Sequence, residues 1–291
     1  MNTSEISKLF KQNNLRVHSY RKDKDKYIIE ANTEKYIVKK NSNKKHIFDY
    51  LNSRSFNYYP KILIDDKYQV SEYVSDLEIP KEQKINDLVD LMAILHNKTT
   101  YNKKTNNDEY ENIYEDLVNN YNYLFEYYTD VIDKVDNTIF LSPSQYLIAR
   151  NISLIFESID AGFNFLQDFK EKIEDIDGLR VCVIHNDLSL NNYKRNNKQY
   201  LLNWDKSKID IPVFDLYKLY NNESELDLSN IVDRYEKKYP LKDIEKNLLI
   251  ILLLMPDKIT FTDNELENCI QIRKSLNKLS KVHKMIFKRK S

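Results

Sequence analysis

His185-Asn186-Asp187-Leu188-Ser189-Leu190-Asn191-Asn192 is the stretch that decides the fold of this chain. It lies between two short, mainly apolar runs at residues 181–184 and 200–204, which are typical of buried strands. A His, an Asp two residues later and an Asn five residues after that Asp have the spacing of a phosphotransfer catalytic loop. In such a loop the Asp faces the hydroxyl that is phosphorylated and the Asn holds a Mg²⁺ ion. The spacing therefore predicts Asp187 as the catalytic group and Asn192 as a metal ligand.

A second segment, Asp210-Ile211-Pro212-Val213-Phe214-Asp215-Leu216, follows shortly afterwards. Together the two segments resemble the aminoglycoside phosphotransferase and choline kinase family, whose pattern reads roughly HGDLxxxN, then IDW, then DPxxDL. The matching positions are His185, Asp187, Leu188, Asn192, Trp204, Pro212, Asp215 and Leu216. Residues 142–153 and 185–218 also resemble spore-coat kinase-like proteins of endospore-forming bacteria. The resemblance covers most of residues 95–256 and implies a protein-kinase-like fold.

Two of the departures from the family pattern matter for the chemistry. The family's metal-binding Asp, which precedes the Trp, is Asn203 here, and the Asp before the Pro is Ile211. An amide brings only a dipole to Mg²⁺, whereas a carboxylate brings a full negative charge, so this change weakens the expected metal site. Choline kinases carry a second acid two positions after the metal Asp, and Asp205 lies at that position. The resemblance thus implies Asn192, Asn203 and Asp205 as the metal ligands, and we expect His185 to support the loop as a scaffold residue.

The resemblance also implies where ATP binds. Lys39 lies at the position of the family's nucleotide-binding Lys, and the segment from Glu72 to Val74 aligns with the hinge whose backbone meets adenine. The usual partner of that Lys is a Glu on the following helix, but residues 41–56 contain only one acid, Asp49.

Glycine content limits how phosphates are held. The chain has two glycines, Gly162 and Gly178, so it has no Gly-rich loop that brings backbone N–H groups onto phosphates. Four cations close to the first predicted turn could hold phosphates with their side chains, or could simply line a solvated hairpin. We expect the solvated hairpin for this group, which consists of Arg21, Lys22, Lys24 and Lys26.

Hydrophobic periodicity predicts a two-lobed α+β structure. Residues 1–74 form a small lobe, with a helix at 3–13, five antiparallel strands at 17–20, 27–31, 35–40, 61–65 and 68–73, and an inserted helix at 44–53. Residues 75–291 form a larger, mostly helical lobe, with an insert at about 97–178 that is expected to set acceptor choice. Its helices are expected at 85–96 (ending at His96), 114–132, from Ser142 onward, and at 212–221, 227–239, 241–255 and 263–290, with a loop at 99–108. The helix from Ser142 begins with a capping box to Gln145, and its predicted inner face is Tyr146, Ala149, Ile152, Phe156 and Ile159.

Composition excludes several classes of protein. The 291 residues include 45 basic and 45 acidic side chains, so a net charge of zero argues against a nucleic-acid or anionic-membrane partner. Two distant cysteines, Cys182 and Cys269, form no disulfide framework, which fits a reducing cytoplasm. The polar N-terminus begins no signal peptide, and the longest apolar run, residues 248–255, is too short to span a bilayer.

Two hypotheses about function stay open. The first is an ATP- and Mg²⁺-dependent phosphotransferase that acts on a hydroxyl of a small molecule, with nucleotide and acceptor as its partners. The second is a pseudokinase of the same fold, which acts as a binding or structural component, with spore-coat proteins as partners and a spore-associated location. Asp187 and Asn192 favour the enzyme, while Asn203 and the missing glycines favour the pseudokinase.

Overall fold

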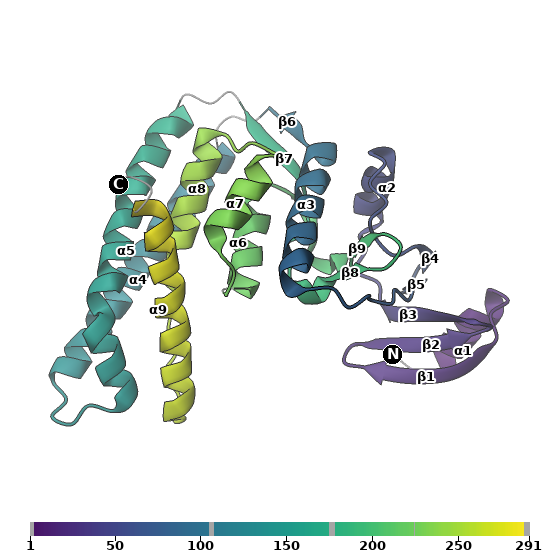
Figure 1. The fold of residues 1–291 in the computed structure, drawn as a ribbon, viewed down its shortest axis with the longest axis horizontal. Coiled ribbons are helices and arrows are strands. Elements are labelled where there is room, and N and C mark those ends of the chain that lie inside the picture. The colour runs from purple at the N-terminus through teal and green to yellow at the C-terminus, as the bar shows by residue number, and fades with distance from the viewer. Residues whose placement is uncertain (1–2, 105–107, 175–177, 224, 288–291) are drawn as a thin grey trace. The chain divides into compact units, whose positions relative to one another are not determined.

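Five short strands near the N-terminus form one antiparallel sheet in the order β1-β2-β3-β5-β4 (Figure 1). Their bounds in this computed structural model are Val17–Asp23 (β1), Lys26–Ala31 (β2), Glu34–Lys40 (β3), Ile62–Asp65 (β4) and Tyr68–Glu72 (β5). The structure describes residues 3–104, 108–174, 178–223 and 225–287. β1 and β2 are joined by a two-residue turn, because Asp23 pairs with Lys26. The predicted five-stranded antiparallel sheet is confirmed.

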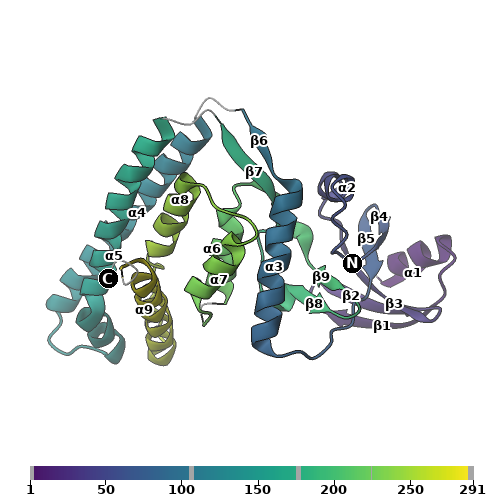
Figure 2. The same ribbon diagram turned by 45° about the horizontal axis from the view of Figure 1, so that its top comes forward.

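One helix covers one face of this sheet. α1 (Thr3–Gln12) lies against the strands of this sheet (Figures 1 and 2). It buries Ile6 and Phe10 against a group of sheet residues, namely Ile29, Ala31, Tyr36, Val38, Tyr68 and Val70. Successive side chains of a strand point to opposite faces. Ile37 and Lys39 of β3 therefore point to the face that α1 does not cover.

Asparagine occupies most of the left-handed backbone positions among the described residues. The non-glycine residues with positive φ are Asn14, Lys24, Asn32, Asn43, Ser55, Asn186 and Asn203, with φ between 53° and 60°. Asn tolerates this conformation better than most residues with a Cβ. A chain with only two glycines thus makes several of its tight turns with asparagine.

The sheet belongs to the first of two compact units, which comprises Met1–Thr99 and Val183–Ile209. Its other elements are α2 (Lys45–Ser53), α3 (Lys81–Thr99), η1 (Leu190–Asn192), β8 (Tyr193–Arg195), β9 (Gln199–Leu201) and η2 (Trp204–Lys206). Trp204 anchors this part of the unit, because its ring meets the rings of Phe48, Phe56 and Tyr59 with centroids 6.1–6.2 Å apart. The predicted division of the chain after Val74 stays a prediction.

The second unit comprises Thr100–Cys182 and Asp210–Ser291 and is mostly helical. A short strand, β6 (Tyr101–Lys103), pairs antiparallel with β7 (Leu179–Ile184), and β10 spans Lys208–Asp210. The helices are α4 (Asp108–Asp136), α5 (Pro143–Glu174), α6 (Val213–Asn222), α7 (Leu228–Glu236), α8 (Asp243–Leu254) and α9 (Glu265–Phe287). α5 packs against α4, α8 and α9, so it is the central helix of this unit.

The N-terminus of α5 forms the predicted capping box. The Ser142 N–H donates to Gln145 Oε1 over 2.9 Å, and the Gln145 N–H donates to Ser142 Oγ over 3.3 Å. Each side chain thus satisfies a backbone group of the other residue, which is the reciprocal arrangement that the sequence indicates.

Three details of the helical region differ from the predictions. α3 continues past His96 to Thr99, and His96 is buried inside its last turn. The predicted loop at 99–108 includes strand β6. This strand is held by backbone pairing with β7 and its side chains are exposed, so its sequence shows no alternation of buried and exposed residues. The predicted inner face of α5 was wrong at Tyr146, which is 58% exposed, whereas Ile148 and Ile155 are buried. A helix with three neighbours is apolar on several sides, so periodicity alone does not select one face. Residues 288–290 of the predicted last helix lie outside the described residues.

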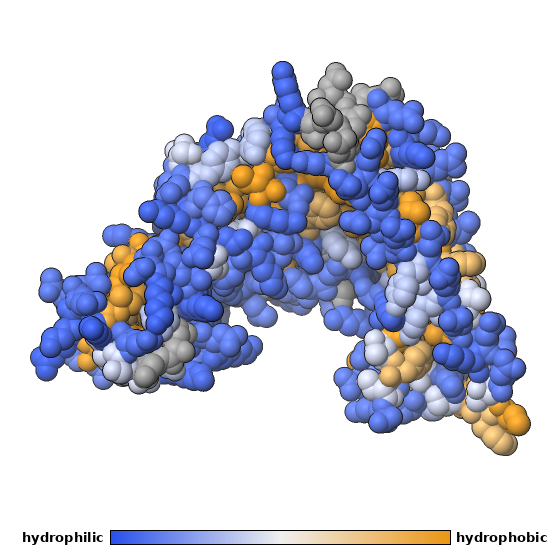
Figure 3. All heavy atoms as spheres, turned by 180° about the vertical axis from the view of Figure 1, so that it is seen from behind, coloured by the Kyte–Doolittle hydropathy of each residue, from blue (hydrophilic) through white to orange (hydrophobic). Residues whose placement is uncertain are grey.

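Apolar side chains are exposed at the loop that joins α4 to α5. Ile139 and Phe140 are 90% and 89% exposed. Figure 3 shows a group of hydrophobic residues at the far tip of the helical part. Among the residues that the structure describes, we find no helix with the length and apolar character needed to cross a membrane.

Candidate active site

The loop after β7 is anchored by His185. This side chain is buried, its Nε2 lies 2.7 Å from the carbonyl oxygen of Leu202, and its ring meets that of Trp204 at 5.0 Å. Asn186 follows with a left-handed φ of 60° and donates through Nδ2 to the Lys206 carbonyl over 3.2 Å. His185 and Asn186 therefore tie the catalytic loop to residues 202–206. This position fits the scaffold role that we expected for His185.

A chain of hydrogen bonds joins three of the predicted site residues. Asn192 Nδ2 donates to the Asp187 backbone carbonyl over 2.7 Å and to Asp187 Oδ2 over 3.1 Å. Asn203 Nδ2 in turn donates to Asn192 Oδ1 over 2.6 Å. Asn203 has φ 60° and ψ 59°, and this turn brings its amide back toward the catalytic loop. The structure thus places Asp187, Asn192 and Asn203 side by side.

Lys39 reaches the same region from the sheet. Its Nζ donates to Asp205 Oδ1 over 2.6 Å, and its side chain is 19% exposed. α2 carries no Glu that could serve as the partner of this Lys, and Asp205 takes that position instead. Asp205 is therefore an ion-pair partner of Lys39 in this structure, whereas the sequence had suggested it as a metal ligand.

The segment expected to meet adenine is held by polar contacts from other residues. The Glu72 N–H donates to the Lys61 carbonyl over 3.0 Å, and Glu72 Oε1 accepts from the Lys61 N–H over 3.0 Å. The buried Val74 gives its carbonyl to Lys194 Nζ over 2.8 Å, and the same ammonium group lies 5.0 Å from the centre of the Tyr73 ring. These contacts fix the backbone of Glu72 and Val74, while the Glu72 side chain is used within the sheet.

Two lysines at the site were not predicted from the sequence. Lys206 Nζ donates to Asp187 Oδ1 over 2.8 Å, with the Lys206 side chain 65% exposed. Lys194 holds Val74 as described above. Both follow predicted site residues closely in the chain, but 45 basic residues give no signal for the few that face a site.

The oxygen atoms at the site suit a divalent cation in kind, since Mg²⁺ takes oxygen ligands. They come from Asp187, Asn192 and Asp205, and each of these accepts a hydrogen bond from another residue of the site, respectively Lys206, Asn203 and Lys39. Within the described part of the chain, no group of three or more His, Cys, Asp or Glu side chains is placed to hold a metal. A bound cation must therefore compete with donors that the protein itself supplies.

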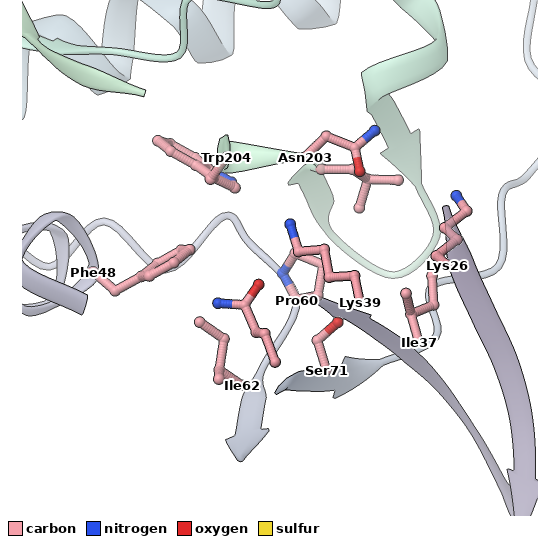
Figure 4. A pocket seen from close by; sticks show the side chains of 11 residues that line it. Lys26, Ile37, Lys39, Phe48, Pro60, Ile62, Ser71, Asn203 and Trp204 are labelled. Carbon is pink, nitrogen blue, oxygen red and sulfur yellow. The ribbon is translucent and has the colours of Figure 1, made fainter. Parts of the chain in front are cut away.

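A cavity of about 50 Å³ lies beside Lys39 (Figure 4). Its lining includes Lys26, Ile37, Lys39, Ser71, Asn203 and Trp204, all from the first unit. Lys26 ends the β1–β2 turn, as expected, with its side chain 33% exposed, and this side chain also lines the cavity. Because side chains of a strand alternate between its two faces, Lys26 lies on the same face of β2 as Ile28. The polar sequence around Lys26 does not show which face of the strand is covered.

Comparisons with known proteins show the fold. No protein-family model matches the chain, and no curated protein matches it. Among solved structures, the aminoglycoside phosphotransferase from Alicyclobacillus acidocaldarius is similar with a TM-score of 0.72, at 9% identity, over 92% of this chain and 90% of that one. Choline kinase LicA from Streptococcus pneumoniae gives 0.51, at 15% identity, over 94% and 98% of the two chains. Amicoumacin kinase hAmiN, in complex with AMP-PNP, Ca²⁺ and Ami, gives 0.51, at 13% identity, over the whole of both chains.

The chain therefore has a protein-kinase-like α+β fold, with a five-stranded antiparallel sheet in its N-terminal part and a helical C-terminal part. Its structural neighbours include an aminoglycoside phosphotransferase and a choline kinase.

Proposed function

We propose that this protein is an ATP-dependent phosphotransferase that transfers the γ-phosphoryl group to a hydroxyl of a small molecule, with Mg²⁺ as its cation. The observation that carries the proposal is the placement of Lys39, Asp187, Asn192, Asn203 and Asp205 within one compact unit, although Lys39 lies far from the others in the sequence. Structural neighbours that are phosphotransferases, one of them with a bound nucleotide analogue and a divalent cation, support it.

Asp187 orients the acceptor in this proposal. Its carboxylate is positioned by Asn192 on one oxygen and by Lys206 on the other. As the acceptor oxygen bonds to the γ-phosphorus, the bond from that phosphorus to the oxygen of ADP breaks, and the acceptor's proton goes to Asp187. The exposed pair with Lys206 is weak, so an incoming hydroxyl displaces it readily.

Lys39 binds the phosphates, and its ammonium group exchanges Asp205 for phosphate oxygens when nucleotide enters. That exchange releases the Asp205 carboxylate, which together with Asn192 and Asn203 would hold the cation. Mg²⁺ supplies neutralisation of the charge that develops on the phosphoryl oxygens. The hinge backbone at Glu72 and Val74 receives the adenine ring.

A second candidate is a pseudokinase that acts as a binding or structural component. The observation that favours it is the hydrogen bond from Asn203 to Asn192 Oδ1, because a neutral amide satisfies the atom that would otherwise bind metal. The sequence resemblance to spore-coat kinase-like proteins supports a spore-associated role with spore-coat partners. A cytoplasmic location fits either candidate.

The test measures ADP release by the purified chain with ATP, Mg²⁺ and a panel of small hydroxyl compounds. We expect turnover with at least one acceptor, and a loss of roughly 10²–10⁴-fold in kcat in Asp187→Asn, the contribution that a positioned proton acceptor makes. Asp66→Asn is the matched control, because it removes the same charge from an exposed turn of the same unit. A wild type that binds ATP but turns over no acceptor would favour the pseudokinase.

A further inference from the structure

Two lysines lie side by side on one face of the sheet. β2 and β3 pair Tyr27 with Val38 and Ile28 with Ile37, so the next residues along the two strands are Lys26 and Lys39. Both side chains line the cavity described above, and in Figure 4 they extend to the same side of the sheet. Like charges on neighbouring strands repel each other, and an anion between them relieves that repulsion.

The acidic contacts of these lysines leave room for such an anion. Lys26 Nζ is 3.6 Å from Asp23 Oδ2, and both side chains are a third or more exposed, so this pair contributes little. Lys39 contacts Asp205, which lies outside the lining of the cavity. Among the described residues that line the cavity, two carry positive charge and none carries a carboxylate.

A third donor in the cavity is Gln69. It pairs with Lys39 across β5 and β3, which places both side chains on one face, and it also lines the cavity. Its side chain is only 4% exposed, and its Nε2 has no hydrogen-bond partner among the residues that the structure describes. A buried N–H without a partner is unfavourable and uncommon in native proteins. A ligand oxygen in the cavity would satisfy it.

The β1–β2 turn has no glycine with which to bring its backbone onto phosphates. The β1–β2 connection consists of Lys24 and Asp25 alone, and neither glycine of the chain lies near it. Side chains must therefore supply the donors that a Gly-rich loop supplies through its backbone. Lys26 stands at the end of this turn, and its side chain lines the cavity.

We propose that Lys26 and Gln69, together with Lys39, form a phosphate subsite that replaces the missing Gly-rich loop by side-chain contacts. The assignment rests on the proposed function, since the phosphate belongs to the bound nucleotide. A cavity of about 50 Å³ holds roughly four water molecules, which suits one phosphate group and excludes a nucleoside. Lys26 and Gln69 are thus phosphate-binding residues that the family pattern does not contain.

The experiment measures the affinities of ATP, adenosine and inorganic triphosphate by isothermal titration calorimetry, each with EDTA and with Mg²⁺. We expect Lys26→Gln to weaken ATP and triphosphate about tenfold, because hydrogen bonds to charged groups contribute more than neutral ones. Adenosine affinity should stay unchanged. Lys22→Gln is the matched control: it removes the same charge from β1, but the register with Tyr27 places it on the opposite face. It should change each affinity less than about twofold.

Gln69→Leu is a second, independent test of the phosphate subsite. It should weaken triphosphate binding and raise the thermal midpoint of the free protein, because it removes a buried donor without a partner. A raised midpoint also shows that the variant folds.

The outcomes separate the two proposals. If the wild type binds ATP and phosphorylates an acceptor, while Lys26→Gln and Gln69→Leu bind triphosphate as the wild type does, the subsite is overturned and the proposed function stands. If the wild type binds triphosphate in a Lys26-dependent way but does not bind ATP, the subsite stands and the nucleotide function falls. If triphosphate binds no more tightly than sulfate, or equally well to Lys22→Gln and Lys26→Gln, the subsite is overturned.

Discussion

At the scale of single residues, two asparagines at left-handed backbone positions shape the candidate site. Asn186 and Asn203 both have φ of 60°, at positions where the family pattern has Gly and Asp. Asn adopts this left-handed conformation at small cost, and its amide both donates and accepts. At position 203 it donates to Asn192 Oδ1 and so links residues 192 and 203. A hydrogen bond between two neutral amides thus stands where the family pattern has a carboxylate.

This reasoning predicts the behaviour of Asn203→Asp. The new carboxylate has no N–H to give to Asn192 Oδ1, so two acceptors face each other at 2.6 Å unless a cation lies between them. We expect the variant to lose about 1 kcal/mol of unfolding free energy in EDTA, which is the net value of a neutral hydrogen bond. Mg²⁺ should restore that loss and tighten metal binding. Thermal and urea unfolding, each with EDTA and with Mg²⁺, measure both effects.

Asn32→Asp is the control for this variant. It makes the same change at another left-handed position of the first unit, with φ of 56°, and there the side-chain oxygen only accepts from the Arg16 N–H. Its stability should not depend on Mg²⁺. Equal Mg²⁺ responses in the two variants would contradict a cation site at Asn192 and Asn203.

Residue spacing predicted part of this site and could not predict the rest. The spacing of Asp187 and Asn192 placed them in one loop, because a short loop between strands holds its members close together. The contact of Lys206 with Asp187 and the burial of Gln69 depend on which way a side chain points. Among so many lysines, that direction is set by strand register and tertiary packing, which local sequence does not specify.

At the scale of elements, α4 and α5 illustrate close packing around a glycine. Tyr121 of α4 is buried and donates to the Ile251 carbonyl over 2.7 Å, and its burial raises the pKa of the phenol well above its usual range. Gly162 of α5 lies against this ring: a Cβ built there would come 2.2–2.4 Å from Tyr121. The glycine is therefore required by the neighbouring ring, since its backbone is ordinary helix.

Gly162→Ala should accordingly destabilise the protein. In an open helix this change stabilises by up to about 1 kcal/mol, but the collision with a buried ring reverses the sign, and over-packing costs typically 1–3 kcal/mol. Urea unfolding measures the change. In a Tyr121→Leu background, Gly162→Ala should lower the free energy of unfolding less than it does in the wild type, because the aromatic ring that the new methyl group meets is absent. A Gly162→Ala protein as stable as the wild type would refute this packing.

Elements were predicted well where local signals act alone. The capping box at Ser142 and Gln145 fixed the start of α5, because both contacts are made within one turn. The strands of the sheet followed from alternation. Tyr146 was wrongly placed on the inner face of α5, and the strand β6 was missed, because both depend on distant neighbours: α8 and α9 in one case and β7 in the other.

At the scale of the whole molecule, the candidate site draws on two distant stretches of the chain. The strands that carry Lys26, Lys39 and Gln69 come from the N-terminal stretch, and the catalytic loop comes from Val183–Ile209, yet both belong to the first unit. The second unit contains α4 and α5, which lie in the region that we expect to choose the acceptor. We therefore propose nucleotide binding for the first unit and expect acceptor choice to depend on the second.

This division predicts where ATP slows amide hydrogen exchange. Saturating ATP at about 100 times its Kd stabilises the bound form by roughly 2.7 kcal/mol, so openings that disrupt the site become about 100-fold rarer. We expect slower exchange in β2, β3, β5 and residues 185–206, measured by mass spectrometry at short times, when local openings dominate. Amides of α4 and α5 should be unaffected at those times, because their local openings do not break a contact to the nucleotide. Lys26→Gln, with ATP raised to the same multiple of its own Kd, should keep the pattern except at the β1–β2 turn. Protection confined to α4 and α5 would move the nucleotide site to the second unit and overturn the assignment of Lys39 and the hinge.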